Sequence, residues 1–119
     1  MKQVSIKLVN KNEIGYNKMI DNGRLISYID DCMMSIMTNE HNYSLFRMTN
    51  LMIIYLGNIT DGDLITLYIR EDTRTRSRLR YRFIIKKEGG IEMEGVIEYS
   101  KICKDGKEIP ICDPISSKL

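Results

Sequence analysis

The sequence predicts an α+β fold in which one helix packs against one face of a curved antiparallel sheet. Only one long segment, Asn22 to Met37, has the periodicity of an amphipathic helix, whereas most other segments alternate polar and apolar residues as strands do. Turn sequences that contain glycine separate these alternating segments. No repeat or change of composition divides the 119 residues, so we expect one domain over residues 1–119.

The predicted elements follow one another in a simple order. A first strand at Val4–Val9 comes before Asp21, whose side chain can cap the helix. A polar loop over 38–43 follows the helix, and residues 104–119 are expected to form an irregular tail that can lie along a neighbouring subunit. Four strands are expected between them, at Leu45–Leu56, Leu64–Arg70, Arg74–Lys86 and Ile91–Ile102.

The arrangement of these four strands follows from their composition and turns. Leu45–Leu56 is long and mostly apolar, so we expect it to be a central strand against which the helix packs. An Asp-Gly turn follows this strand, and Gly89-Gly90 follows the strand that ends at Lys86. We therefore expect the four strands to form an antiparallel meander.

The composition is that of an ordinary soluble globular protein, with 43% hydrophobic and 29% charged residues. No apolar run is long enough to span a membrane. The N-terminal segment alternates polar and apolar residues and has no secretory signal pattern, so we expect a cytoplasmic protein with no membrane partner.

The cysteines and the single histidine favour neither a disulfide framework nor a metal site. Cys32, Cys103 and Cys112 are odd in number and widely spaced, and only His41 could add an imidazole. We expect no metal site, and we expect His41 to be a loop residue, because it comes just after the predicted helix. A catalytic role for it is disfavoured, because no serine or cysteine near it has a nucleophile motif.

Two adjacent carboxylates interrupt the apolar stripe of the predicted helix. Asp30 falls at the border of the stripe, and Asp31 falls on the opposite side, where water would solvate it. A carboxylate at the edge of a buried face loses hydration and becomes a stronger base, so Asp30 is the first candidate for a catalytic group and Asp31 the second. The alternative is a helix flank with two solvated acids. The stripe consists of Leu25, Ile26, Ile29, Cys32, Met33, Ile36 and Met37.

Arginines occupy every second position between residues 74 and 82. In one regular strand, all their guanidinium groups share a face, which has to meet water, acidic side chains or an anionic ligand such as a phosphate. Glu92, Glu94 and Glu98 on the next strand are candidate acidic partners. No nucleic acid partner is expected, because the net charge is only +2. The arginines are Arg74, Arg76, Arg78, Arg80 and Arg82.

The start of the helix resembles that of acyl-CoA thioesterases of the phenylacetate-pathway type, which have the hotdog fold. Asn22-Gly23 opens the helix, and Asp30 follows the glycine by seven residues. These enzymes usually have a His-Gly-Gly step where this chain has Asp21-Asn22-Gly23. The resemblance implies a curved antiparallel sheet wrapped around one long central helix.

The chain also resembles, over nearly its whole length, the 3-aminobutyryl-CoA ammonia-lyases, a small hotdog family. That family has a glutamate four residues after its helix aspartate, whereas Met34 and Ser35 stand at the corresponding positions here. The resembling pieces are Val4–Leu8, Asn22-Gly23, the acidic pair, Leu45-Phe46-Arg47, Gly62-Asp63 and Thr75-Arg76-Ser77-Arg78.

These resemblances imply a protein that processes an acyl-CoA or acyl-carrier thioester as a homodimer or higher homo-oligomer. Hydrolysis is slightly favoured, because it needs only one carboxylate. The alternatives are elimination of ammonia from a 3-aminoacyl-CoA and binding of the thioester without turnover. No cofactor is expected, since coenzyme A would be part of the substrate.

The implied site lies between two subunits. One supplies the catalytic acid and the backbone amides that stabilise the thioester oxygen, and the other supplies substrate contacts. The candidates are Asp30 and Asp31 for catalysis, Asn22, Gly23 and Arg24 for the oxyanion, Tyr43, Arg47 and Asn50 for the substrate, and Arg76, Arg78 and Arg80 for the CoA phosphates.

Overall fold

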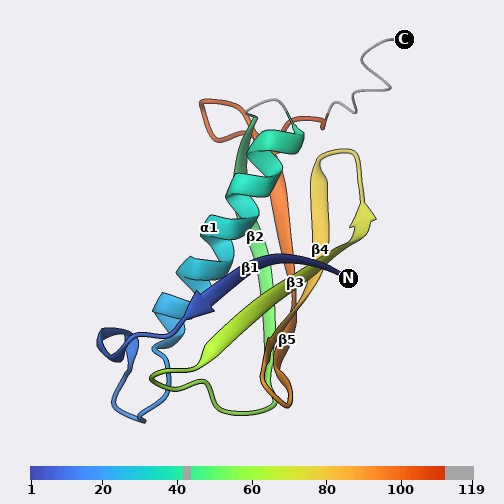
Figure 1. The fold of residues 1–119 in the computed structure, drawn as a ribbon. Coiled ribbons are helices and arrows are strands. Elements are labelled where there is room, and N and C mark those ends of the chain that lie inside the picture. Colours follow the sequence, from blue (N-terminus) through green and yellow to red (C-terminus); the bar gives the residue numbers. More distant parts are fainter. Residues whose placement is uncertain (42–43, 112–119) are drawn as a thin grey trace.

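The computed structural model describes residues 1–41 and 44–111, which form one long helix and a five-stranded antiparallel sheet (Figure 1). The strand order is β1-β3-β4-β5-β2. The predicted α+β architecture is therefore confirmed. The elements are β1 (Lys2–Leu8), the short helix η1 (Lys11–Glu13), α1 (Asn22–Glu40), β2 (Leu45–Tyr55), β3 (Leu64–Arg74), β4 (Arg78–Lys87) and β5 (Gly90–Ile102).

Helix α1 begins after Asp21, whose side chain accepts a hydrogen bond from the backbone N–H of Arg24 at 3.2 Å. The helix continues to Glu40, one turn beyond the predicted end. Its fully buried residues are spaced four apart, so they form one stripe along the helix. That stripe consists of Leu25, Ile29, Met33 and Met37.

The helix lies along one face of the curved sheet (Figure 1). Its buried stripe belongs to the same core as inward-facing residues of β3, β4 and β5, among them Leu67, Phe83 and Ile97. The hydroxyl of Tyr28 lies 2.7 Å from the Ser5 hydroxyl and ties the helix to β1. In the described part of the chain, no helix is both long and apolar enough to cross a membrane.

The position of β2 differs from the prediction. It pairs with β5 and forms one edge of the sheet, so it is not a central strand, and the meander consists of β3, β4 and β5 only. The prediction of a central position was wrong, because an apolar run does not distinguish a central strand from an edge strand, whereas the predicted packing of the helix against this strand is confirmed. Met52 and Ile54 remain 54% and 46% exposed on the outer face.

The arginine-rich segment is also divided differently. It contains a turn, closed by a hydrogen bond of 3.0 Å from the Thr75 N–H to the Arg78 carbonyl and one of 3.2 Å from the Arg78 N–H to the Thr75 hydroxyl. Arg74 therefore ends β3, and Arg76 lies in the turn. The prediction that all five arginines share the face of one strand was wrong, and only Arg78, Arg80 and Arg82 do so on β4.

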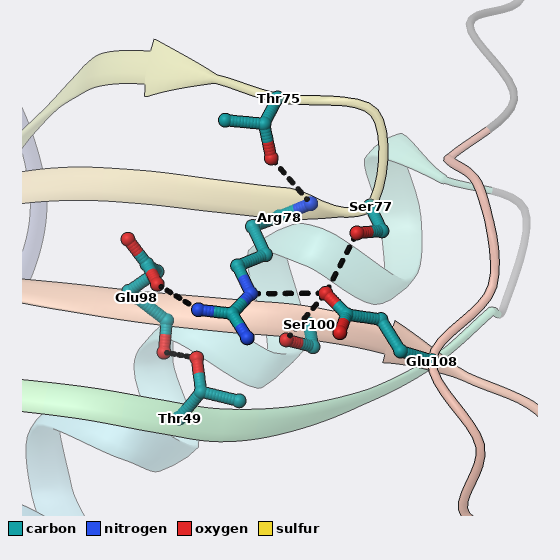
Figure 2. A network of polar contacts seen from close by, with 7 residues as sticks. All are labelled: Thr49, Thr75, Ser77, Arg78, Glu98, Ser100 and Glu108. Atoms are coloured by element: carbon teal, nitrogen blue, oxygen red, sulfur yellow. Dashed lines mark hydrogen bonds and ion pairs between the residues drawn. The ribbon is translucent and has the colours of Figure 1, made fainter.

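The described part of the predicted tail folds back onto the chain's own sheet. The Ile109 N–H donates to the Lys101 carbonyl at 2.9 Å, and the Ile111 N–H donates to the Arg76 carbonyl at 2.7 Å. Glu108 joins this segment to the β3–β4 turn and to β5 through a cluster of polar contacts (Figure 2). Cys112 and the rest of the tail lie outside the described residues.

Candidate functional site

The start of α1 offers two backbone amides that could bind a negatively charged oxygen. The N–H groups of Asn22 and Gly23 donate no hydrogen bond within residues 1–41 and 44–111. The Arg24 N–H is already held by the Asp21 cap, so the predicted group of three amides narrows to the first two. Unpaired amides and the positive end of the helix dipole together favour an anion at this position.

A cleft of about 460 Å³ opens beside these amides. The Tyr55 hydroxyl, at the end of β2, donates a hydrogen bond of 2.8 Å to Oδ1 of Asn22 in the wall of this cleft. Partial burial raises the pKa of Tyr55, so its phenol remains a neutral donor. The cleft is lined by Asn17, Met19, Ile20, Asn22 and residues 55–59.

Asp30 lies further along the helix, half-buried where α1 meets the sheet, while Asp31 is exposed. This difference agrees with the predicted periodicity. The Tyr99 hydroxyl on β5 donates a hydrogen bond of 2.6 Å to Oδ1 of Asp30. The second oxygen, Oδ2, has no hydrogen-bond partner among the described residues, so it could accept a proton.

One subunit does not bring the carboxylate and the free amides together. Asp30 follows Asn22 by eight residues, which corresponds to about 12 Å along an α-helix. Asp30 is also not among the residues that line the cleft. A thioester carbon cannot reach both groups across that distance.

Two of the predicted substrate-binding residues, Arg47 and Asn50, lie on β2. Both are exposed, Asn50 at the middle of the strand and Arg47 nearer its start, and neither lines the cleft at Tyr55. Tyr43 lies outside the described residues. The structure therefore does not bring Arg47 and Asn50 to the helix start of the same subunit.

Two of the three arginines proposed for phosphate binding, Arg78 and Arg80, have acidic neighbours. Arg78 is paired with Glu98 at 3.1 Å and with Glu108 at 2.9 Å. The pairing with Glu98 was predicted, whereas the Glu108 contact was not. Arg80 lies 3.5 Å from Asp72 on β3.

Arg76 is different, because it is exposed in the β3–β4 turn and forms no ion pair within the described part of the chain. It is therefore the member of the predicted phosphate-binding group that could accept a new anion without losing an ion pair. Its role in CoA binding stays a prediction.

Sequence reasoning missed two tyrosines, Tyr55 and Tyr99. Each contacts a predicted site residue, but the partners are distant in sequence, so no local motif relates them. One feature of the sequence could have pointed to Tyr99, which is its place on the apolar face of its strand. A phenol that is buried there usually needs a hydrogen-bond partner.

No family model and no curated protein matches the sequence. The fold, however, is similar to that of several solved structures. One is an aspartate-to-alanine mutant of a hexameric broad specificity acyl-coenzyme A thioesterase, with a TM-score of 0.81 and 12% identity over 98% of this chain and 92% of that one.

Two further structures have the same architecture. A hexameric hotdog fold thioesterase of Campylobacter jejuni has a TM-score of 0.78 and 13% identity, and the match covers 94% of this chain and 91% of that one. The chain has the hotdog fold. A protein from Staphylococcus aureus, solved in complex with CoA, has a TM-score of 0.84 and 12% identity, with 98% and 80% of the two chains covered.

The hotdog fold confirms the predicted arrangement of a sheet wrapped around a long central helix. Two of these three neighbours are thioesterases by name, and none of the three is described as an ammonia-lyase. The more specific resemblance to ammonia-lyases therefore gains no support from them.

Proposed function

We propose that this hotdog protein hydrolyses acyl-CoA thioesters, with Asp30 as the general base. The observation that carries the proposal is the state of its carboxylate, which is half-buried, held at Oδ1 by Tyr99 and unoccupied at Oδ2 among the described residues. A fixed carboxylate with one available oxygen is suited to accept a proton from water. The exposed Asp31 has no such restraint within residues 1–41 and 44–111.

In the proposed reaction, Oδ2 of Asp30 takes a proton from a water molecule whose oxygen attacks the thioester carbon. The N–H groups of Asn22 and Gly23 donate to the oxygen that becomes negative in the tetrahedral intermediate. The C–S bond then breaks, and the leaving thiolate takes the proton back from Asp30. The products are a free acid and CoA.

The separation of about 12 Å between these groups leads us to propose a site between two subunits. The helix start of one subunit would then face Asp30 of another. The edge strand β2 has a free side on which a second copy can pair, and the named thioesterase neighbours are hexamers. Tyr43, Arg47 and Asn50 would come from the opposite subunit, and Arg76, Arg78 and Arg80 would bind the CoA phosphates.

The direct test is to incubate the pure protein with a panel of acyl-CoA and 3-aminoacyl-CoA thioesters and to measure free thiol and ammonia separately. We expect thiol release that falls about 100-fold or more in Asp30→Asn. Asp31→Asn serves as the matched variant one position away and should retain near-wild-type activity.

Other outcomes would contradict the proposal in different ways. Ammonia release without thiol would indicate elimination. A thioester that binds and stays intact for hours would indicate a binding subunit. Equal losses in the two variants would contradict the choice of Asp30 over Asp31.

A further inference from the structure

We propose that Tyr99 is a positioning residue, which holds one oxygen of Asp30 so that the other faces the attacking water. This inference rests on the proposed thioester hydrolysis and adds a residue to it. Tyr99 would not touch the substrate. It would act only through the carboxylate.

The geometry restricts both partners. The Tyr99 side chain is completely buried, and in the sheet it lies opposite Leu79 of β4 and Met48 of β2, so the core fixes its ring. Its hydroxyl lies where the sheet meets the helix and donates a hydrogen bond of 2.6 Å to Oδ1 of Asp30. A rigid donor on the sheet therefore determines the orientation of a carboxylate on the helix.

The charges around this pair keep the direction of the hydrogen bond constant. Burial and the carboxylate of Asp30 raise the pKa of Tyr99, and the nearby Tyr81 and Asp31 act in the same direction. The phenol therefore stays protonated and donates throughout the ordinary pH range. Among the described residues, no lysine or arginine forms an ion pair with Asp30, so Tyr99 is the main stabilising contact of its ionised form.

The same contact explains why one of two adjacent acids is suited to catalysis. Asp31 is exposed and has no hydrogen-bond partner in the described part of the chain, so its carboxylate can rotate freely in water. Asp30 loses that freedom before any substrate binds. A base fixed in advance avoids the entropic cost of orientation during the reaction.

The test compares Tyr99→Phe with Tyr81→Phe. Both variants remove one buried phenolic oxygen, but the Tyr81 hydroxyl has no hydrogen-bond partner among the described residues. Activity on acyl-CoA thioesters is measured as kcat and KM between about pH 4 and pH 8, and thermal unfolding is measured in parallel.

For Tyr99→Phe we expect kcat to fall about tenfold with KM within about twofold, because the change affects the reacting state and not substrate binding. Tyr81→Phe should change neither quantity. In an Asp30→Asn background, Tyr99→Phe should cause no further loss of activity.

An unchanged kcat in Tyr99→Phe, or a further loss of activity in the Asp30→Asn background, would overturn the positioning role while leaving the hydrolysis intact. Equal effects of Tyr99→Phe and Tyr81→Phe would also overturn it, since they would show a general response of the core. A wild-type protein that releases no thiol from any acyl-CoA would instead overturn the proposed function, and the positioning role with it.

Discussion

Oε1 of Glu108 lies 2.9 Å from Nε of Arg78 and 2.6 Å from the hydroxyl of Ser77 (Figure 2). The hydroxyl of Ser100, a buried residue of β5, lies 3.3 Å from the same oxygen. One carboxylate thus joins the C-terminal segment to the β3–β4 turn and to β5. The hydrogen bond from Arg78 is the main reason why the pKa of Glu108 falls to about 2.

Glu108→Gln should make the C-terminal segment open more often than in wild type. The size of this difference should depend on pH. Because the pKa of Glu108 is lower in the folded state, its stabilising contribution is complete above about pH 4.5 and is lost as the pH falls towards 2. We expect faster hydrogen exchange at the amides of Ile109 and Ile111 in the variant at pH 6, and a much smaller difference from wild type near pH 2.

Glu88→Gln is the control for this experiment, because Glu88 is exposed in the β4–β5 turn and forms no ion pair within the described residues. It should leave the exchange of both amides unchanged. Equal exchange in wild type and Glu108→Gln at pH 6 would contradict the role of the cluster.

His41 should make the protein less stable in mild acid. It is 6% exposed, its ring packs edge-on against Phe46, and neither ring nitrogen has a hydrogen-bond partner among the described residues. Burial, followed by the nearby Arg74, lowers the pKa of His41. The unfolded chain therefore binds this proton more readily, and the free energy of unfolding decreases as the pH falls below about 6.5.

Replacing His41 with Leu should remove this part of the pH dependence. The free energy of unfolding is measured with urea at pH 7 and at pH 5 for both proteins. Between these two pH values it should fall by about 1 kcal/mol more in wild type than in His41→Leu. The same pH dependence in both proteins would contradict the prediction.

Gly95 allows β2 and β5 to pair next to a large aromatic ring. A Cβ atom at this position would lie 2.3 Å from the Met52 carbonyl oxygen and 2.6 Å from the Phe83 ring. Gly95→Ala should therefore destabilise the fold by about 1 to 3 kcal/mol, measured by urea unfolding. Gly90→Ala is a matched control, because a Cβ there meets no atom within 4 Å, and an equal loss in both variants would count against the packing argument.

The helix was predictable because its pattern is local. Its buried residues repeat every four positions, and the capping aspartate stands directly before its first residue. The different exposures of Asp30 and Asp31 follow from the same periodicity. These features need no knowledge of the rest of the chain.

The edge position of β2 and the turn within the arginines could not be predicted in this way. An apolar strand looks the same in the centre of a sheet and at an edge that carries exposed Met52 and Ile54. The turn at residues 75–77 contains neither glycine nor proline and is closed by hydrogen bonds of Thr75. The order of the strands, and the closure of a turn by a side chain, depend on contacts between distant residues. The alternation of polar and apolar residues does not determine those contacts.

The candidate site was predictable only in its helical part. Asp30 and the helix start were identified from their spacing, whereas Tyr99 joins Asp30 from 69 positions away. Tyr55 reaches Asn22 across 33 positions. Such pairs form only after the sheet has curved around the helix.

The order of strands also determines how a growing chain can fold. During translation, β2 leaves the ribosome before β3, β4 and β5, yet its pairing partner in the sheet is β5. Its main-chain hydrogen-bonding groups therefore stay unpaired until the last strand is made, while Met52 and Ile54 stay exposed throughout. Until then, this strand is the part of the nascent protein most open to chaperones and to aggregation.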